Sequence, residues 1–411
     1  MRRCASLAAL AASFALLLVI QSGCGGGGSS NTPASGLDER VFIAIQNSGI
    51  SSLPIADANK NQLSANSVSN VGSAPSLMIP GANNTTLVFG SGDRSVSIVD
   101  NLKEVLATSE TSCQSGVTCV PFLSADTESI VASSDGKFAY AALPTISQVA
   151  VVALTAGPPI TVTNIPATPA NCAATNNCLP GAHRLVLSHN NSKLLVFNEA
   201  LNQFEVINTS DNSVKTVTGT GLDHPSYAVF SADDSKAYIL NCGSECGGTQ
   251  ASVSVLDTSA LTITQTVNVD AATIGMSDTN NLYIAGTGPN GGSATVLPLS
   301  SLTPGKAIGI GDGFHQVIAL FQSKLIIGAR TCSKGCMSII DPSAGTAVVD
   351  SAKGDVTSIT AITPRKVVYA TEGGEVRIYD LTTNQELLNN NTPLIDVVGK
   401  AASVIYVGPK T

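Results

Sequence analysis

The sequence contains no tryptophan, and phenylalanine and tyrosine bring its aromatic content to only 4% of 411 residues. Large amphipathic rings are the usual platforms against which sugar rings and other flat ligands stack. A chain with so few of them offers little surface for carbohydrate recognition. We therefore expect a protein or peptide ligand in preference to a glycan.

Positive charge is also scarce, with 21 Lys and Arg residues against 29 Asp and Glu residues and a formal net charge of −8. Nucleic-acid binding depends on a basic patch that neutralises phosphates. The basic residues of this chain are spread without such a run. We expect no nucleic-acid partner.

Only one long apolar run is present, from Cys4 to Ile20, between the basic pair Arg2 and Arg3 and a small-residue end at Cys24. The run is shorter than the roughly 20 residues that a transmembrane helix needs. A charged start, an apolar middle and a small-residue end predict a secretory signal peptide over residues 1–23. We expect the mature chain not to span a membrane.

Residues 17–24, LLVIQSGC, resemble the lipobox of bacterial lipoproteins, although Gln21 stands where leucine is usual. The resemblance implies an exported protein that is lipidated on Cys24 and anchored to a membrane only through that N-terminus, facing the periplasm or the cell surface. Residues 24–37 are rich in Gly and Ser and read as a flexible tether. An ordinary cleaved signal with a Gly-rich mature end is the alternative.

Eight of the ten cysteines remain once Cys4 and Cys24 are set aside. They fall into four close pairs: Cys113 with Cys119, Cys172 with Cys178, Cys242 with Cys246, and Cys332 with Cys336. In an oxidising envelope such pairs predict local disulfides that stiffen four loops. Zinc is the rival interpretation, but two of the spacings are too wide for a usual zinc knuckle.

Short β-rich segments bounded by turn formers recur from residue 41 onward, and no stretch has a helical period. The clearest copy, Ser226 to Val269, contains four strands. Its second strand recurs with starts at Val41, Thr86, Phe138, Lys193, Ala237, Leu282, Lys324 and Val367. The pattern predicts an all-β fold, a single β-propeller domain over residues 38–411 with four-stranded antiparallel blades. Eight blades fit best, with seven as the alternative.

The third strand of the repeat commonly ends in a carboxylate or amide that can cap the following turn, at Asp57, Asp100, Asn208, Asp257, Asp341 and Asp380. Together with the turns SSDGKFAY at Ser133 and SADDSKAY at Ser231 and the strand SVSVLD at Ser252, this arrangement resembles the YVTN-type, WD40-like β-propeller repeat family. The resemblance covers residues 41–408. It implies a fold and no particular activity.

The two ends of the repeat region are complementary, because the chain enters at a second strand, near Val41, and its last segment, Ala402 to Val407, looks like a first strand. A terminal strand that completes the first blade would close the ring and remove an open sheet edge. We expect the C-terminal strand to close the ring in this way. We also expect the protein to be a monomer.

Candidate site residues gather in the loops that precede innermost strands. Three of the four histidines, His183, His224 and His315, occupy nearly the same repeat position, and His189 lies in a turn on the opposite face. With acidic and basic neighbours they form a candidate cluster at the mouth of the central channel: His183, Arg184, Asp223, His224, Asp312 and His315, with Asp126 and Glu128 in an equivalent loop. Imidazoles and carboxylates suit a divalent metal or a general base. A purely structural role of the repeat is the alternative.

These observations favour a cell-envelope lipoprotein whose propeller is a ligand- or protein-binding scaffold without catalysis. The alternative is a hydrolase that resembles the lactonase-type propellers, with a metal or His-based site in the channel, although no family motif maps onto these residues. A quinoprotein dehydrogenase would suit eight blades, but such enzymes use Trp-bearing docking motifs that this chain lacks.

Overall fold

The computed structural model describes residues 35–107, 120–155, 160–167, 178–351 and 353–408, all within the compact unit Ala34–Thr411. The predicted signal peptide, the lipidation site Cys24 and the cysteines Cys113, Cys119 and Cys172 lie outside the described residues. No helix in the described ranges is long and apolar enough to cross a membrane.

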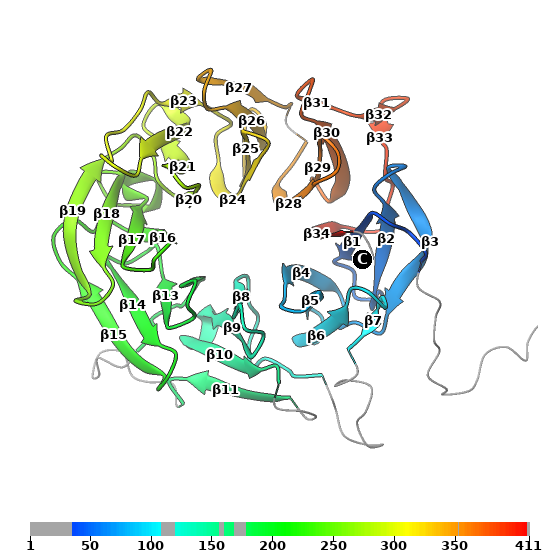
Figure 1. Cartoon of the computed structure of the whole chain (residues 1–411), viewed down its shortest axis with the longest axis horizontal. Coiled ribbons are helices and arrows are strands. Elements are labelled where there is room, and N and C mark those ends of the chain that lie inside the picture. The colour runs from blue at the N-terminus through cyan, green and yellow to red at the C-terminus, as the bar shows by residue number, and fades with distance from the viewer. Residues whose placement is uncertain (1–34, 108–119, 156–159, 168–177, 352, 409–411) are drawn as a thin grey trace, which may run out of the picture. The chain divides into compact units, whose positions relative to one another are not determined.

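The strands form eight four-stranded antiparallel sheets, the blades of a β-propeller, as predicted (Figure 1). Blade 1 contains β34 (Ala401–Gly408), β1 (Arg40–Ile45), β2 (Ser52–Asp57) and β3 (Gln62–Ser69). Blade 2 contains β4 (Pro75–Pro80), β5 (Thr85–Gly90), β6 (Ser95–Asp100) and β7 (Val105–Leu106). Blade 3 contains β8 (Ile130–Ala132), β9 (Phe138–Leu143), β10 (Gln148–Ala153) and β11 (Thr161–Ile165). Blade 4 contains β12 (Arg184–Leu187), β13 (Lys193–Phe197), β14 (Gln203–Asn208) and β15 (Ser213–Thr218).

The second half of the ring repeats the plan. Blade 5 contains β16 (Pro225–Phe230), β17 (Lys236–Asn241), β18 (Ser252–Asp257) and β19 (Thr262–Asn268). Blade 6 contains β20 (Ile274–Ser277), β21 (Asn281–Gly288), β22 (Gly291–Pro298) and β23 (Ile308–Gly309). Blade 7 contains β24 (Phe314–Phe321), β25 (Lys324–Arg330), β26 (Met337–Asp341) and β27 (Thr346–Val349). Blade 8 contains β28 (Val356–Ile362), β29 (Val367–Glu372), β30 (Glu375–Asp380) and β31 (Gln385–Glu386).

Three small elements were not predicted. A two-stranded hairpin, β32 (Leu388–Asn389) and β33 (Thr392–Pro393), follows blade 8, and two short 3-10 helices lie at η1 (Pro144–Ile146) and η2 (Gly243–Cys246). Their individual strands and helices span only two to four residues, too few to leave a periodic pattern in the sequence.

The C-terminal strand closes the ring, as predicted. β34 pairs antiparallel with β1, with Ile43 opposite Val404 in the register. It also contacts the innermost strands of both flanking blades, β28 and β4. The first blade is therefore built from both ends of the chain, and β34 pairs the inner edge of β1, which would otherwise be open.

The core is divided among the blade interfaces. Eight clusters of buried apolar side chains occur, one between each pair of neighbouring blades. Successive side chains of a strand point to opposite faces of the sheet. Each inner strand therefore contributes side chains to the interfaces on both sides of its blade. Phe197 and Phe204, for example, stack at the interface of blades 4 and 5. Outer strands such as β19 are mostly exposed.

The acidic ends of the third strands make turns, as predicted. Asp257 Oδ1 accepts hydrogen bonds from the backbone N–H groups of Ser259 and Ala260, both at 2.9 Å. Asp341 does the same for Ser343 and Ala344. Since their oxygens are occupied by the turn, these carboxylates are structural.

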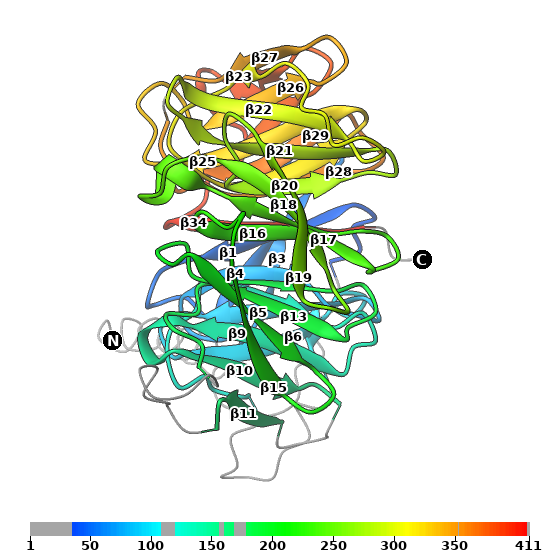
Figure 2. The same cartoon turned by 90° about the vertical axis from the view of Figure 1, so that its left-hand side faces the viewer.

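The loops of the propeller emerge on two faces, because strand direction alternates within a blade. In Figure 2 the strands run between these faces and the connections gather at them. The loops after second and fourth strands share one face, which we call the disulfide face because Cys242–Cys246 follows β17 and Cys332–Cys336 follows β25. Both disulfides were predicted.

Candidate functional site

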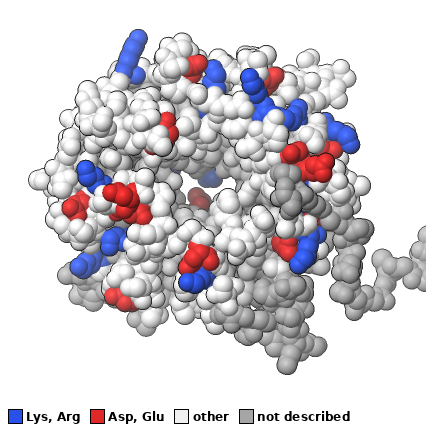
Figure 3. Space-filling view, in the orientation of Figure 1, with Lys and Arg blue, Asp and Glu red and all other residues white. Residues whose placement is uncertain are grey.

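The ring encloses a central channel whose wall is formed by the innermost strands of the blades. Figure 3 shows the molecule hollowed at its centre, with blue and red atoms inside the hollow. A cavity of about 250 Å³ lies in this wall, between β12, β16 and β20. Its lining residues include Val186, Tyr227, Val229 and Met276, together with the polar His189 and Ser277.

His183 stands at the channel mouth on the disulfide face, directly before β12. Its Nδ1 is 2.7 Å from Glu199 Oε1, and Glu199 lies in the loop after β13 of the same blade. Its Nε2 is 3.7 Å from Glu128 Oε2, which comes from blade 3. The carboxylates of Glu128 and Glu199 raise the pKa of His183 to about 9. The ring is therefore an imidazolium at neutral pH.

Arg184 reaches from blade 4 across to blades 6 and 7. Its Nη1 donates a hydrogen bond to the carbonyl oxygen of Thr273 at 3.2 Å, and its guanidinium lies 4.8 Å from the ring centre of Phe314. Thr273 also donates its hydroxyl to Glu245, whose Oε2 accepts a further hydrogen bond from the Thr287 N–H at 2.8 Å. Burial raises the pKa of the Glu245 carboxyl. Arg184 thus ties three blades together at the channel.

A second arginine completes the group from the far side of the ring. Arg330, at the end of β25 in blade 7, brings Nη1 to 3.8 Å from Glu128 Oε2. The same carboxylate oxygen of Glu128 therefore faces His183 of blade 4 and Arg330 of blade 7. We call Glu128, His183, Arg184, Glu199, Glu245 and Arg330 the channel cluster.

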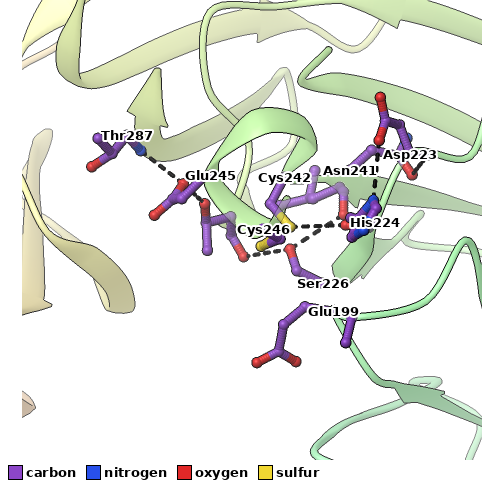
Figure 4. Close-up of a disulfide and its surroundings, with 12 residues drawn as sticks. Glu199, Asp223, His224, Ser226, Asn241, Cys242, Glu245, Cys246 and Thr287 are labelled. Atoms are coloured by element: carbon purple, nitrogen blue, oxygen red, sulfur yellow. Dashed lines mark hydrogen bonds and ion pairs between the residues drawn. A yellow bond between two sulfur atoms is a disulfide. The ribbon is translucent and has the colours of Figure 1, made fainter. Parts of the chain in front are cut away.

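Asp223 and His224 brace the first disulfide loop (Figure 4). Asp223 Oδ2 accepts hydrogen bonds from the backbone N–H groups of Thr249 and Gln250 at 2.9 and 2.8 Å. His224 Nδ1 is 3.2 Å from Asp223 Oδ1. A Cβ on Gly248 would stand 1.8 Å from that same oxygen, so a larger residue there would displace the Asp223 side chain. Asp223 fastens the Cys242–Cys246 loop to the start of its own blade.

Asp312 and His315 repeat this arrangement in blade 7. Asp312 Oδ1 accepts the backbone N–H groups of Ser333 and Lys334 at 2.9 and 3.2 Å, which fastens the Cys332–Cys336 loop. The His315 ring is buried, and its Nε2 is 3.0 Å from the Gly311 carbonyl oxygen. Burial lowers the pKa of His315 to about 4. This histidine is neutral at physiological pH and packs inside the blade.

The structure divides the predicted site residues into two kinds. His183 and Arg184 line the channel, whereas Asp223, His224, Asp312 and His315 hold loops. The three histidines form no common group, and no set of three or more His, Cys, Asp or Glu side chains in the described ranges is arranged to hold a metal ion.

Sequence reasoning missed Glu199, Glu245 and Arg330. All three lie at or just after the end of a second strand, β13, β17 and β25 respectively. Those positions open onto the same face as the loops that carry His183 and Glu128. A search for charged residues directly after second strands would have found them.

Glu205 on β14 is a buried carboxylate outside the channel, 2% exposed, with Gln203 Nε2 donating to it at 2.8 Å. Burial raises its pKa from 4.5 to about 7. Because the folded state holds the proton more tightly, the stability that this group contributes is complete below pH 4.5 and is lost as pH rises through about 7.

We therefore expect Glu205→Gln to raise the free energy of unfolding by up to about 3 kcal/mol at pH 8 and to leave it unchanged at pH 4. Urea denaturation at the two pH values measures the difference. An equal effect at both would contradict the assignment.

No protein-family model and no curated protein matches the sequence. Among solved structures, the chain is similar to dihydro-heme d1 dehydrogenase NirN in complex with DHE, with 12% identity and a TM-score of 0.61 over 92% of this chain and 76% of that one. It is also similar to U3-55K, with 14% identity and a TM-score of 0.51 over 69% and 85% of the two chains. The RRP9 WD40 repeats match with 14% identity and a TM-score of 0.50 over 69% and 84%. At such identities these likenesses concern the fold alone, and the chain shares the architecture of WD40-like β-propellers.

Proposed function

We propose that the protein is a binding propeller of the cell envelope that receives a protein or peptide ligand on its disulfide face, at the mouth of the central channel. One observation carries the proposal. Two disulfide loops on that face are each fastened by an aspartate at the start of the same blade, Asp223 and Asp312.

Such bracing suits recognition. A loop that is already ordered loses less conformational entropy when it binds, so more of the contact energy appears as affinity. Each aspartate holds backbone N–H groups, and each loop is also closed by a disulfide. The exposed side chains Gln250 and Lys334 are therefore presented by rigid backbone.

The alternative of a lactonase-like hydrolase has less support. A general base must be unprotonated at the working pH, whereas the neighbouring carboxylates raise the pKa of His183 to about 9. His315 has a suitably low pKa but is buried. A cationic His183 is better suited to hold an anionic group.

The test is affinity capture from extracts of the native envelope with wild-type protein and with the double variant Asp223→Ala/Asp312→Ala. We expect a specific partner that the variant captures at least ten times less, because its loops lose their fastening. The matched control is Asp211→Ala/Asp233→Ala, which removes two turn aspartates from the opposite face. No partner for the wild type, or equal loss in both variants, would overturn the proposal.

The anchor belongs to the same proposal and is tested separately. If Cys24 is the lipidated residue, the Cys24→Ser variant should incorporate no radiolabelled palmitate. It should also move from the membrane fraction to the soluble fraction. A variant that is still labelled would contradict lipidation at this residue.

A further inference from the structure

We propose that the channel cluster is a carboxylate-recognition site, in which His183 and Arg330 bind the C-terminal carboxylate of a peptide and the apolar side chain of its last residue enters the cavity beside β12. This inference rests on the proposed function and names the ligand chemistry of the same channel. Capture of a terminal carboxylate by cationic and N–H groups is a known mode of peptide recognition.

Glu128 marks where the ligand carboxylate would lie. Its side chain is 65% exposed, and its Oε2 faces His183 Nε2 at 3.7 Å and Arg330 Nη1 at 3.8 Å. Charge-assisted hydrogen bonds are much shorter, about 2.7–2.9 Å. Both cations therefore face a carboxylate that neither of them hydrogen-bonds. An incoming carboxylate can displace Glu128 and make both bonds.

The channel cluster holds three carboxylates and three cations, so it gains a net positive charge only when Glu128 moves aside. Glu199 already holds the other nitrogen of His183 at 2.7 Å, so the imidazolium is oriented with Nε2 toward the channel. Arg330 Nε is buried and has no hydrogen-bond partner. Once Glu128 moves aside, His183 and Arg330 are the cations left for a ligand.

A cavity adjoins Arg184. Arg184 and Val186 lie on one strand, β12, two residues and so about 7 Å apart. Val186 lines the cavity of about 250 Å³ together with Tyr227 and Met276. Tyr227 also lies near Arg184. Burial raises the pKa of the Tyr227 hydroxyl, and the charge of Arg184 acts in the opposite direction. A side chain of leucine size, attached to the bound carboxylate, suits this space.

The experiment is isothermal titration calorimetry of the full chain with the peptide acetyl-Ala-Ala-Ala-Leu, carrying a free C-terminus, and with its C-terminal amide. We expect the free acid to bind at least ten times more tightly than the amide. His183→Gln and Arg330→Gln should each weaken the free acid about 10- to 100-fold, the usual loss for a charge-assisted hydrogen bond. Glu128→Gln should tighten it several-fold, because it removes the internal competitor.

The matched control uses the exposed ion pair of Lys137 and Asp135, whose Nζ and Oδ2 atoms are 3.1 Å apart. Lys137→Gln and Asp135→Asn should leave the affinity unchanged. Melting temperatures of all variants identify any that misfold, and Glu128→Gln keeps the test decisive because a gain of affinity cannot arise from unfolding.

Equal binding of acid and amide, or weaker binding by Glu128→Gln, would overturn the inference. Hexanoate tests whether a small carboxylic acid is the ligand instead. If hexanoate binds and the peptide does not, the carboxylate site stands but a peptide is not its ligand. Failure of both probes while envelope capture still depends on Asp223 and Asp312 would overturn this inference and leave the proposed function standing.

Discussion

Removal of residues 401–411 is expected to unfold the whole ring, although it deletes a single strand. β34 pairs with β1 and packs against β28 and β4, so its loss opens three blades at once. It buries Val404 and Ile405, each contributing about 1.5–3 kcal/mol, and it leaves the inner edge of β1 unpaired. Because domains are stable by only about 5–15 kcal/mol, we expect loss of cooperative thermal unfolding or an insoluble product.

The control for this deletion is truncation after Gly408, which keeps all of β34. Circular dichroism melting of the two truncated proteins gives the comparison. A melting temperature within a few degrees of wild type after removal of residues 401–411 would contradict closure of the ring by this strand.

Arg40→Ala is expected to be the most destabilising single substitution outside the apolar core. The Arg40 side chain is fully buried, and its Nη1 is 2.9 Å from Glu104 Oε1, which joins blade 1 to blade 2. Its Nη2 also donates to the carbonyl oxygen of Gly408 on β34 at 3.3 Å. Loss of Arg40 removes the ion pair with the buried Glu104 carboxylate, which keeps its hydrogen bond from the Ser35 hydroxyl, and breaking such a buried pair costs about 3–5 kcal/mol.

A double variant separates the charge from the packing. Arg40→Met/Glu104→Leu removes both charges and keeps most of the volume, so it should recover more than half of the lost stability. Urea denaturation measures both proteins. A loss below about 1 kcal/mol for Arg40→Ala, or a double variant less stable than the single one, would show that the ion pair has no such role.

The fold was predictable because its signals repeat along the chain. Eight second strands, beginning near Val41 and ending near Val367, each carry a short β-rich run, and the aspartates at third-strand ends mark the turns that follow. Repetition averages out the uncertainty of any one segment. The same repeats predicted the closing strand. The first copy lacks its first strand, and Ala402–Val407 is a first-strand segment left over at the end of the chain.

The site was only partly predictable because it is assembled across the ring. Repeat position predicted His183, His224 and His315 alike at the channel mouth. The structure separates them, since His224 lies against Asp223 beside a disulfide loop and His315 is buried within its blade.

Arg330 and Glu128 could not have been joined from the sequence, because they come from blades 7 and 3, some 200 residues apart, and meet only across the channel. Which side chains face one another across a closed ring depends on blade number and register, and neither is visible in a local motif.

The most direct test of the central claim, that ligands bind on the disulfide face, is photocrosslinking in the native envelope. Benzoylphenylalanine is placed in turn at Gln250 and Lys334 on that face, and at Asn212 and Ser235, exposed positions on the opposite face. The proposal predicts one discrete adduct from positions 250 and 334 and none from 212 and 235. Adducts from the opposite face alone, or from no position, would contradict it.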